Sequence, residues 1–122
     1  MHDILEPRHH MIDYVEFASV DPQAICAFFE ATIGWSFEWF GPDHVAFHGA
    51  RLEGGIYRAD MVSPSADGGA LILFYSRDLA ASEALVLSQG ESIIKHVFDF
   101  SGGRRFQFAE PTGNEFAFWS NV

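Results

Sequence analysis

The histidines and the single cysteine are the residues whose types first suggest chemistry. His44 and His48 form an H-x-x-x-H pair, a spacing that on a helix would bring two imidazoles together as metal ligands. The segment HVAFH is instead typical of a β-strand, where both rings would share one face about 13 Å apart, too far for one ion to bridge. A lone Cys26 excludes an internal disulfide and a Cys-rich zinc site, and we interpret it as a small buried side chain.

Glu16 is the main candidate for acid–base chemistry. It lies on an alternating segment over 12–19, on the same face as Tyr14. A carboxylate that faces an apolar pocket is costly unless it is paired or hydrogen-bonded, and a shielded carboxylate suits a general base. Tyr14 and Tyr75 are candidates to donate hydrogen bonds to it. The alternative is a salt bridge from one of three arginines, Arg58, Arg104 or Arg105.

Composition narrows the class of protein. The 122 residues amount to one domain, and 48% are hydrophobic against 20% charged, so a packed core is expected. Seven Lys and Arg against 17 Asp and Glu give a net charge of −10, which argues against nucleic acid and anionic membranes as partners. No apolar run is long enough to span a membrane, and the first residues show no signal-peptide core, so we expect a cytoplasmic protein.

The same order of strand, helix-start and helix-end signals occurs twice along the chain. A strand pattern precedes Asp21, which predicts a helix N-cap, and Gly34 predicts the end of that helix. A second strand pattern precedes Asp78, 57 positions after Asp21, and Gly90 closes the second helix. Each helix is followed by three segments typical of strands. The sequence therefore predicts two equivalent modules of strand, helix and three strands, over about 12–62 and 70–122, behind an extended arm over 1–11.

Two segments carry a resemblance to a known family. YVEFASVDPQAICAFFEATIGWSFE at 14–38 and GGRRFQFAEPTGNEFAFWS at 102–120 resemble the opening and closing motifs of the vicinal-oxygen-chelate superfamily, which includes glyoxalases, bleomycin-resistance proteins and extradiol dioxygenases. The resemblance implies an α+β fold in which two βαβββ modules form a pair of half-barrels within a single domain over 12–122. It also implies a homodimer and a cleft known for holding a divalent metal.

The resemblance further implies which positions would ligate that metal. The first, third and fourth correspond to Tyr14, Leu71 and Ala117, and the second falls near 53–57, where Glu53 is the candidate carboxylate. Leucine and alanine have no donor atom, and a neutral phenol is a poor ligand beside histidine or carboxylate. Because catalytic metals are typically held by three or four protein groups, we expect no metal and no other cofactor.

Period-two alternation indicates which side chains would line the cleft. They combine aromatic and aliphatic groups with a few hydroxyls and carboxylates, which suits a small amphipathic organic molecule. The opposite faces of the same strands are apolar and are expected to pack on the helices. The predicted ligand-binding residues are Tyr14, Glu16, Leu71, Leu73, Tyr75, Glu115 and Trp119.

The leading hypothesis is a metal-free, homodimeric protein that binds such a molecule in the manner of bleomycin-resistance proteins, with an acidic surface that could steer a cationic ligand. One alternative is a lyase, isomerase or dioxygenase relative. It would use Glu16 as general base, or a rearranged divalent-metal site that combines His48 or His96 with Glu16 or Glu115. Another is a dimer whose cleft is filled and whose partner is a protein. The residues alone leave open whether the chain is an enzyme.

Overall fold

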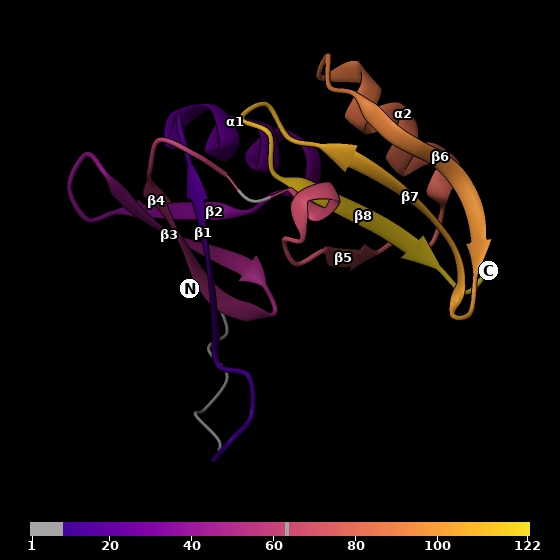
Figure 1. Cartoon of the computed structure of the whole chain (residues 1–122), viewed down its shortest axis with the longest axis horizontal. Helices are drawn as coiled ribbons and strands as arrows, with labels where there is room; N and C mark the ends of the chain where they lie inside the picture. Colours follow the sequence, from indigo (N-terminus) through magenta and orange to yellow (C-terminus); the bar gives the residue numbers. More distant parts are fainter. Residues whose placement is uncertain (1–8, 63) are drawn as a thin grey trace. The chain divides into compact units, whose positions relative to one another are not determined.

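The chain divides into two compact units, Met1–Val62 and Ser63–Val122 (Figure 1). The computed structural model describes residues 9–62 and 64–122. Most of the arm predicted over 1–11 therefore lies outside the described residues, and its last part, from His9 to Met11, is an exposed turn and bend. Each unit is described below by itself.

The first unit is a four-stranded sheet with one helix. Its strand order is β1-β4-β3-β2, in which β1 and β4 are parallel and the other pairs are antiparallel. Parallel neighbours need a crossover, which the intervening helix and two strands supply. In chain order the elements are β1 (Tyr14–Ser19), α1 (Pro22–Ile33), β2 (Ser36–Trp39), β3 (His44–Ala50) and β4 (Leu52–Arg58).

The predicted caps of α1 are confirmed. The Asp21 side chain accepts a hydrogen bond from the Ala24 backbone N–H at 3.3 Å, and Pro22 occupies the first turn, where a missing N–H costs nothing. Gly34 follows the helix with φ of 72°, the left-handed conformation in which glycine meets no Cβ penalty. Two local signals therefore set both ends of the helix.

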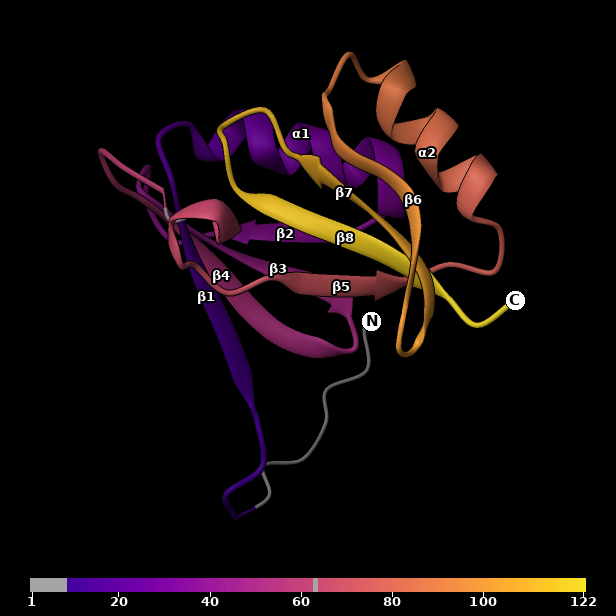
Figure 2. The ribbon, with the colours of Figure 1, turned by 45° about the vertical axis from the view of Figure 1, so that its right-hand side comes forward.

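The second unit repeats this plan. Its strand order is β5-β8-β7-β6, with β5 and β8 parallel, and Figure 2 shows β8 running between β5 and β7. Asp78 caps the helix by accepting from the Ala81 N–H at 3.1 Å. The elements are η1 (Ser65–Asp67), β5 (Ile72–Tyr75), α2 (Leu79–Ser88), β6 (Ile93–Phe100), β7 (Gly103–Ala109) and β8 (Glu115–Ser120).

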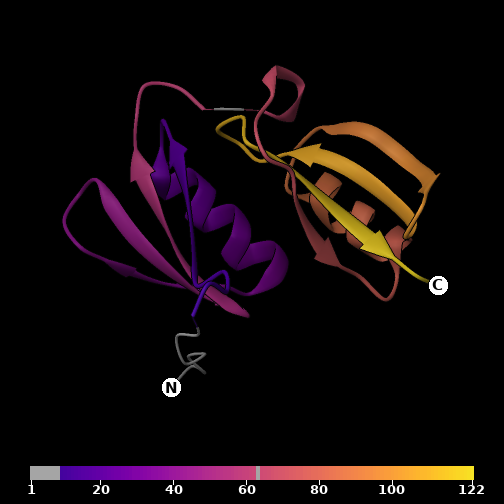
Figure 3. The same ribbon diagram turned by 60° about the horizontal axis from the view of Figure 1, so that its bottom comes forward.

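Each helix covers an apolar face of its own sheet (Figure 3). In the first unit the Trp35 ring lies between Phe29 of α1 and Phe47 of β3, with ring centroids 4.6 and 4.2 Å away. Phe47 also contacts Phe17 of β1 at 5.7 Å. These rings form the core of the unit, and burial of aromatic surface stabilises it.

The covered face of the second unit is a stack of phenylalanines. Phe118 lies at its centre, with three neighbouring ring centroids between 5.4 and 5.6 Å away. Helix α2 contributes the buried Leu79 and Val86. The five rings are Phe74, Phe106, Phe108, Phe116 and Phe118.

The predicted α+β class and the order of strand, helix and three strands in each module are confirmed. Some strand boundaries differ from the prediction; among them, β1 begins at Tyr14 rather than Ile12, and β5 begins at Ile72, so Leu71 precedes its strand. Among residues 9–62 and 64–122, no helix has the length and apolar character needed to cross a membrane.

Candidate functional site

Each sheet has one face covered by its helix and one face that the helix leaves uncovered, which we call the open face. Side chains of directly paired residues in a sheet project from the same face, so the register defines which residues share it. Tyr14 pairs with Glu53, and His44 pairs with Tyr57. By this rule the first open face carries Tyr14, Glu16, Glu38, His44, His48, Glu53 and Tyr57.

Two of these side chains approach one carboxylate oxygen of a third, Glu16. The Tyr14 hydroxyl donates a hydrogen bond to Oε2 of Glu16 at 2.9 Å, and Nε2 of His44 lies 3.6 Å from the same oxygen. The group meets above Gly55, where a Cβ would collide with the Tyr14 hydroxyl and lie 2.9 Å from His44 Nε2. A glycine at this position therefore makes room for the cluster.

The surroundings of Tyr14 hold its phenol in the protonated form. Burial raises the pKa of Tyr14 above 10.0, and the hydrogen bond to Glu16 and the charge of that carboxylate raise it further. Tyr14 is thus a hydrogen-bond donor at neutral pH. The Glu16 side chain is 44% exposed, which is more than we expected for a carboxylate inside an enclosed pocket.

The alternative salt bridge from Arg58 to Glu16 is wrong. Arg58 Nε donates to the carboxylate of Asp43 at 2.9 Å, and its terminal nitrogens donate to Gln23 and to the carbonyl of Val20. The reason is strand alternation: Tyr57 shares the open face, so its neighbour Arg58 projects from the other one.

His48 is shared between two other carboxylates of the first open face. Its Nδ1 lies 2.7 Å from Glu53, and its Nε2 lies 3.7 Å from Glu38. His44 and His48 therefore contact different carboxylates. Sequence analysis treated Glu53 only as a loose metal candidate and missed Glu38, although alternation along β2 places Glu38 on this face.

The second open face has a different composition. Leu73 pairs with Ala117, and Arg105 pairs with both Trp119 and Phe98. The face combines large rings with basic and amide groups: Leu73, Tyr75, Lys95, Phe98, Phe100, Arg105, Gln107, Glu115, Ala117 and Trp119.

Four of the predicted ligand-binding residues belong to this second face. Tyr75 and Trp119 meet edge to face, with ring centroids 5.2 Å apart. The Tyr75 hydroxyl donates to Asn121 at 2.8 Å, so its proton is already engaged. Glu115 accepts a hydrogen bond from the Ser65 hydroxyl. Leu73 is the fourth; Leu71 lies before β5, while Tyr14 and Glu16 lie in the first unit.

The residues at the metal positions implied by the family resemblance do not fit a metal ion. Leu71 and Ala117 have no donor atom, and Ala117 is fully buried. Tyr14 is a protonated phenol bound to Glu16, and Glu53 is bound to His48.

The candidate ligands of the rearranged metal sites do not lie together within either unit. His96 lies 3.4 Å from Glu83 of α2, on the covered side, whereas Glu115 shares the open face of the same sheet. His48 is paired with Glu53 rather than grouped with Glu16. In the part of the chain that the structure describes, no group of three or more His, Cys, Asp or Glu side chains is suited to hold a metal.

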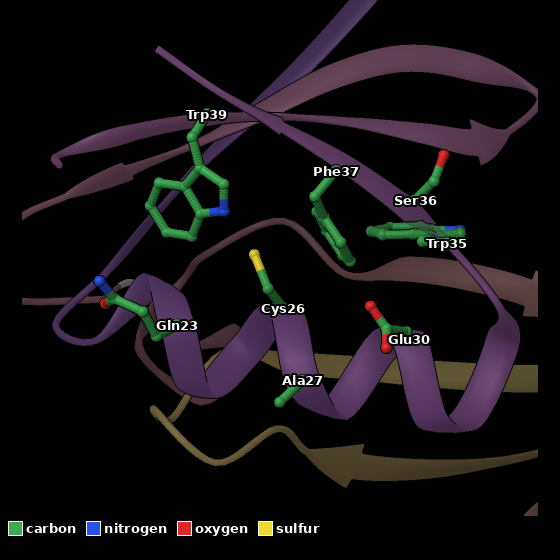
Figure 4. A pocket seen from close by; sticks show the side chains of 8 residues that line it. All are labelled: Gln23, Cys26, Ala27, Glu30, Trp35, Ser36, Phe37 and Trp39. Atoms are coloured by element: carbon green, nitrogen blue, oxygen red, sulfur yellow. The ribbon is translucent and has the colours of Figure 1, made fainter. Parts of the chain in front are cut away.

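A pocket of about 690 Å³ lies between α1 and β2, on the covered side of the first sheet (Figure 4). In Figure 4 the Cys26 thiol points into the space between Phe37 and Trp39. Burial raises the pKa of Cys26 to about 12, with a further contribution from Glu30, so the thiol is protonated and a poor nucleophile. The interpretation of Cys26 as a buried side chain is confirmed. Sequence analysis missed this pocket, which is lined by Gln23, Cys26, Ala27, Glu30, Trp35, Ser36, Phe37 and Trp39.

Solved structures resemble the chain over nearly its whole length. A glyoxalase/bleomycin resistance protein/dioxygenase family enzyme from Burkholderia phytofirmans PsJN matches with a TM-score of 0.75 at 13% identity, covering 90% of this chain and 98% of that one. The chain has the glyoxalase/bleomycin-resistance/dioxygenase fold. The resemblance predicted from the sequence is confirmed at this level.

Two further structures agree with this assignment. A glyoxalase-related enzyme from Fulvimarina pelagi matches with a TM-score of 0.75 at 14% identity, covering 93% of this chain and 89% of that one. Lactoylglutathione lyase from Agrobacterium tumefaciens matches with a TM-score of 0.69 at 19% identity, covering 93% and 96%. No family model matches the sequence. No curated protein matches it significantly. Identities this low establish a shared fold and no shared activity.

Proposed function

We propose that this chain binds a small amphipathic organic molecule through the open faces of its sheets, without the metal for which the glyoxalase/bleomycin-resistance/dioxygenase fold is known. The observation that carries the proposal is the contrast between the two sides of each sheet. The covered sides hold aromatic and aliphatic side chains, whereas the open sides present hydroxyls, carboxylates and imidazoles beside aromatic rings. Polar groups of this kind fix the orientation of a ligand, and the rings supply contact area.

The cluster above Gly55 supports a polar contact on the first face. His44 Nε2 has no hydrogen-bond partner among the described residues, and it lies beside the partly exposed carboxylate of Glu16. A ligand hydroxyl or amine placed between these two groups could bind both of them. A buried nitrogen without a partner is costly, so a ligand that supplies the partner gains binding free energy.

The metal-free part of the proposal depends on donor chemistry. Leu71 and Ala117 cannot coordinate an ion in any arrangement of the two units, because neither side chain has a lone pair. Tyr14, at the first ligand position, keeps its proton and donates a hydrogen bond to Glu16. The residues assigned to the ligand are those predicted from the sequence, with Leu71 at the margin because it precedes β5.

A second candidate function is proton abstraction by Glu16, which the contacts of its Oε2 favour. Tyr14 and His44 both approach that oxygen, so a proton taken by the carboxylate would have a neighbouring imidazole to receive it. Replacing Glu16 with Gln separates the two functions. The substitution would abolish turnover of a substrate and leave a binding protein with much of its affinity.

A thermal-shift screen tests the proposal. Purified protein is heated with small aromatic compounds and antibiotics, each with and without added nickel, zinc or manganese. We expect at least one compound to raise the melting temperature equally well in both conditions, because a ligand of the native state stabilises it. Stabilisation that depends on a metal, together with tight stoichiometric metal binding, would overturn the proposal.

The homodimer and the cytoplasmic location stay predictions. Sedimentation equilibrium of the full chain measures the first, and we expect twice the mass of 13.6 kDa. A monomer that still binds its ligand would show that a second copy is not required for the proposed function.

A further inference from the structure

Two cations on the second open face lie over one aromatic ring. The guanidinium of Arg105 lies 5.1 Å from the centre of the Phe98 ring and 4.8 Å from that of Phe100. The ammonium of Lys95 lies 5.8 Å from the Phe98 ring. Contacts of this kind attract a cation to the negative face of a ring and limit the positions that the side chain samples.

An irregularity in β6 brings these residues together. Lys95 pairs with Gln107 and Phe98 pairs with Arg105, and the register shifts between the two pairs. In a regular strand, residues three apart would project from opposite faces, so the shift is what places Lys95 and Phe98 on the same one. His96, the neighbour of Lys95, lies next to Glu83 of α2 on the covered side, as this assignment requires.

Neither cation has an acidic partner among the described residues. The chain carries 17 acidic side chains against seven basic ones, and Arg58, in the first unit, is paired with Asp43. By contrast, the contacts of the Arg105 side chain within the described part of the chain are those with the two rings, and its Nε has no hydrogen-bond partner there. Glu115 shares the open face, but it accepts the Ser65 hydroxyl. Two positive charges near one ring repel each other when no carboxylate lies between them, and a bound anion would relieve that repulsion.

We infer that Lys95, Arg105 and Gln107 form an anion subsite of the proposed ligand-binding face, which takes the carboxylate of a small aromatic acid. The guanidinium can present two parallel N–H donors to a carboxylate, a geometry that an ammonium or a neutral group does not match. The nearly buried Gln107 amide, on the same face, offers a further donor. The ring of the acid would pack against Trp119, which pairs with Arg105 across the strands.

This inference rests on the proposed function, and it makes the ligand of the second face an anion. Sequence analysis considered a cationic ligand because of the net charge of −10. Net charge acts at long range and is screened by salt, whereas the subsite acts at contact distance. A carboxylate ligand bound there would therefore be recognised against the field of the whole chain.

Two indole compounds of nearly equal shape test the subsite. Indole-3-acetate carries a carboxylate, and indole-3-acetamide carries a neutral amide in its place. Isothermal titration of the full chain with each compound gives two dissociation constants. We expect the acetate to bind about tenfold more tightly, because a charge-assisted hydrogen bond is worth about that factor.

Matched variants assign the preference to named residues. Arg105→Gln should bind both compounds equally, with the loss confined to the acetate. Arg104→Gln is the control. The guanidinium of Arg104 is adjacent in sequence to the subsite, but it is exposed and donates to the Val122 carbonyl instead. The exposed Lys95→Gln should reduce the preference in part, and it serves as the second variant if Arg105→Gln does not fold.

The outcomes separate the subsite from the function on which it rests. Equal binding of both compounds by the wild-type chain, unchanged in Arg105→Gln, would overturn the subsite and leave small-molecule binding in place. Failure of both indoles to bind a chain that binds neutral compounds of the thermal screen would do the same. Failure of every compound to bind would overturn the proposed function together with the subsite.

Discussion

The two sheets share one strand order and differ most on their open faces. The first open face gathers Glu16, Glu38 and Glu53 around His44 and His48, and its hydrogen bonds are mostly between charged or titratable groups. The open face of the second sheet gathers rings around two cations, and it has a single carboxylate, which is held by a serine. One topology therefore presents an acidic surface in one unit and a basic, aromatic surface in the other.

The covered faces show why this divergence is possible. Both are aromatic cores against a helix, built around Phe47 in the first unit and Phe118 in the second. Burial of these rings provides the stability of each unit, so the open faces can vary without loss of the fold. The comparison teaches that stability and chemistry occupy opposite sides of the same strands.

The largest expected effect is a difference in the free energy of unfolding between substitutions at two neighbouring residues of β8. Phe118 points into the covered core and Trp119 into the open face. Phe118→Ala should lower the free energy of unfolding by about 3–5 kcal/mol, because it leaves a cavity among three rings. Trp119→Ala should cost roughly 1 kcal/mol and weaken ligand binding instead. Urea unfolding of both variants measures the difference, and equal losses would break the division between the two faces.

Two adjacent glycines of β4 test the same difference between the covered and the open face of a sheet. A Cβ at Gly54 would collide with the Phe47 ring and with the backbone oxygen of Val15, which cannot move aside. Gly54→Ala should therefore lower the free energy of unfolding by about 1–3 kcal/mol. The neighbouring position faces the other side of the sheet, and its substitution is the matched control.

Gly55→Ala should change stability little and binding a great deal. The new Cβ would meet the flexible ends of Tyr14 and His44, which can turn away from it. We expect the free energy of unfolding to change by less than about 1 kcal/mol. The hydrogen bond from Tyr14 to Glu16 should be lost, and ligands of the first face should bind more weakly. A large loss of stability would mean that the cluster is structural.

A buried carboxylate in the connection that leads into β8 makes stability depend on pH. Glu110 is buried before β8 and accepts hydrogen bonds from the backbone and hydroxyl of Thr112 and from Asn114. Burial nevertheless raises the pKa of Glu110 above 4.5, with these hydrogen bonds opposing the rise. The folded state thus binds this proton more tightly than the unfolded state. Its contribution to stability is present at acid pH and is lost as pH rises through the raised pKa.

Comparison with Glu110→Gln isolates this contribution from the other acids. The free energy of unfolding of the wild-type chain, relative to the variant, should fall between acid and neutral pH. A constant difference between the wild-type chain and Glu110→Gln would contradict the prediction.

The smallest expected effect concerns the phenol of Tyr14. Glu16→Gln removes the carboxylate that accepts its hydrogen bond, so the pKa of Tyr14 should fall toward 10.0, with the share due to burial remaining. Ultraviolet titration of tyrosine ionisation measures the change. Tyr14→Phe identifies its signal against those of Tyr57 and Tyr75. An unchanged pKa would mean that the contact with Glu16 is absent in solution.

Much of the fold could be predicted because its signals are local. Asp21 and Asp78 cap helices through bonds to residues three positions on, and Gly34 ends a helix by its own φ. Alternation placed Tyr14 and Glu16 together on one face of β1. The partners of Arg58 and the shared position of His48 could not be predicted in this way, because the pairing register joins residues far apart in the chain.

The sequence by itself determined the order of elements, the apolar sides of the strands and the lack of a donor atom at Leu71 and Ala117, because these follow from residue type and short spacing. Only the tertiary structure decided which polar groups meet. Tyr14, Glu16 and His44 converge because β4 pairs with β1 on one side and β3 on the other, above a glycine. Lys95 joins Arg105 because β6 shifts its register. Strand pairing depends on contacts along whole edges, which no short segment specifies.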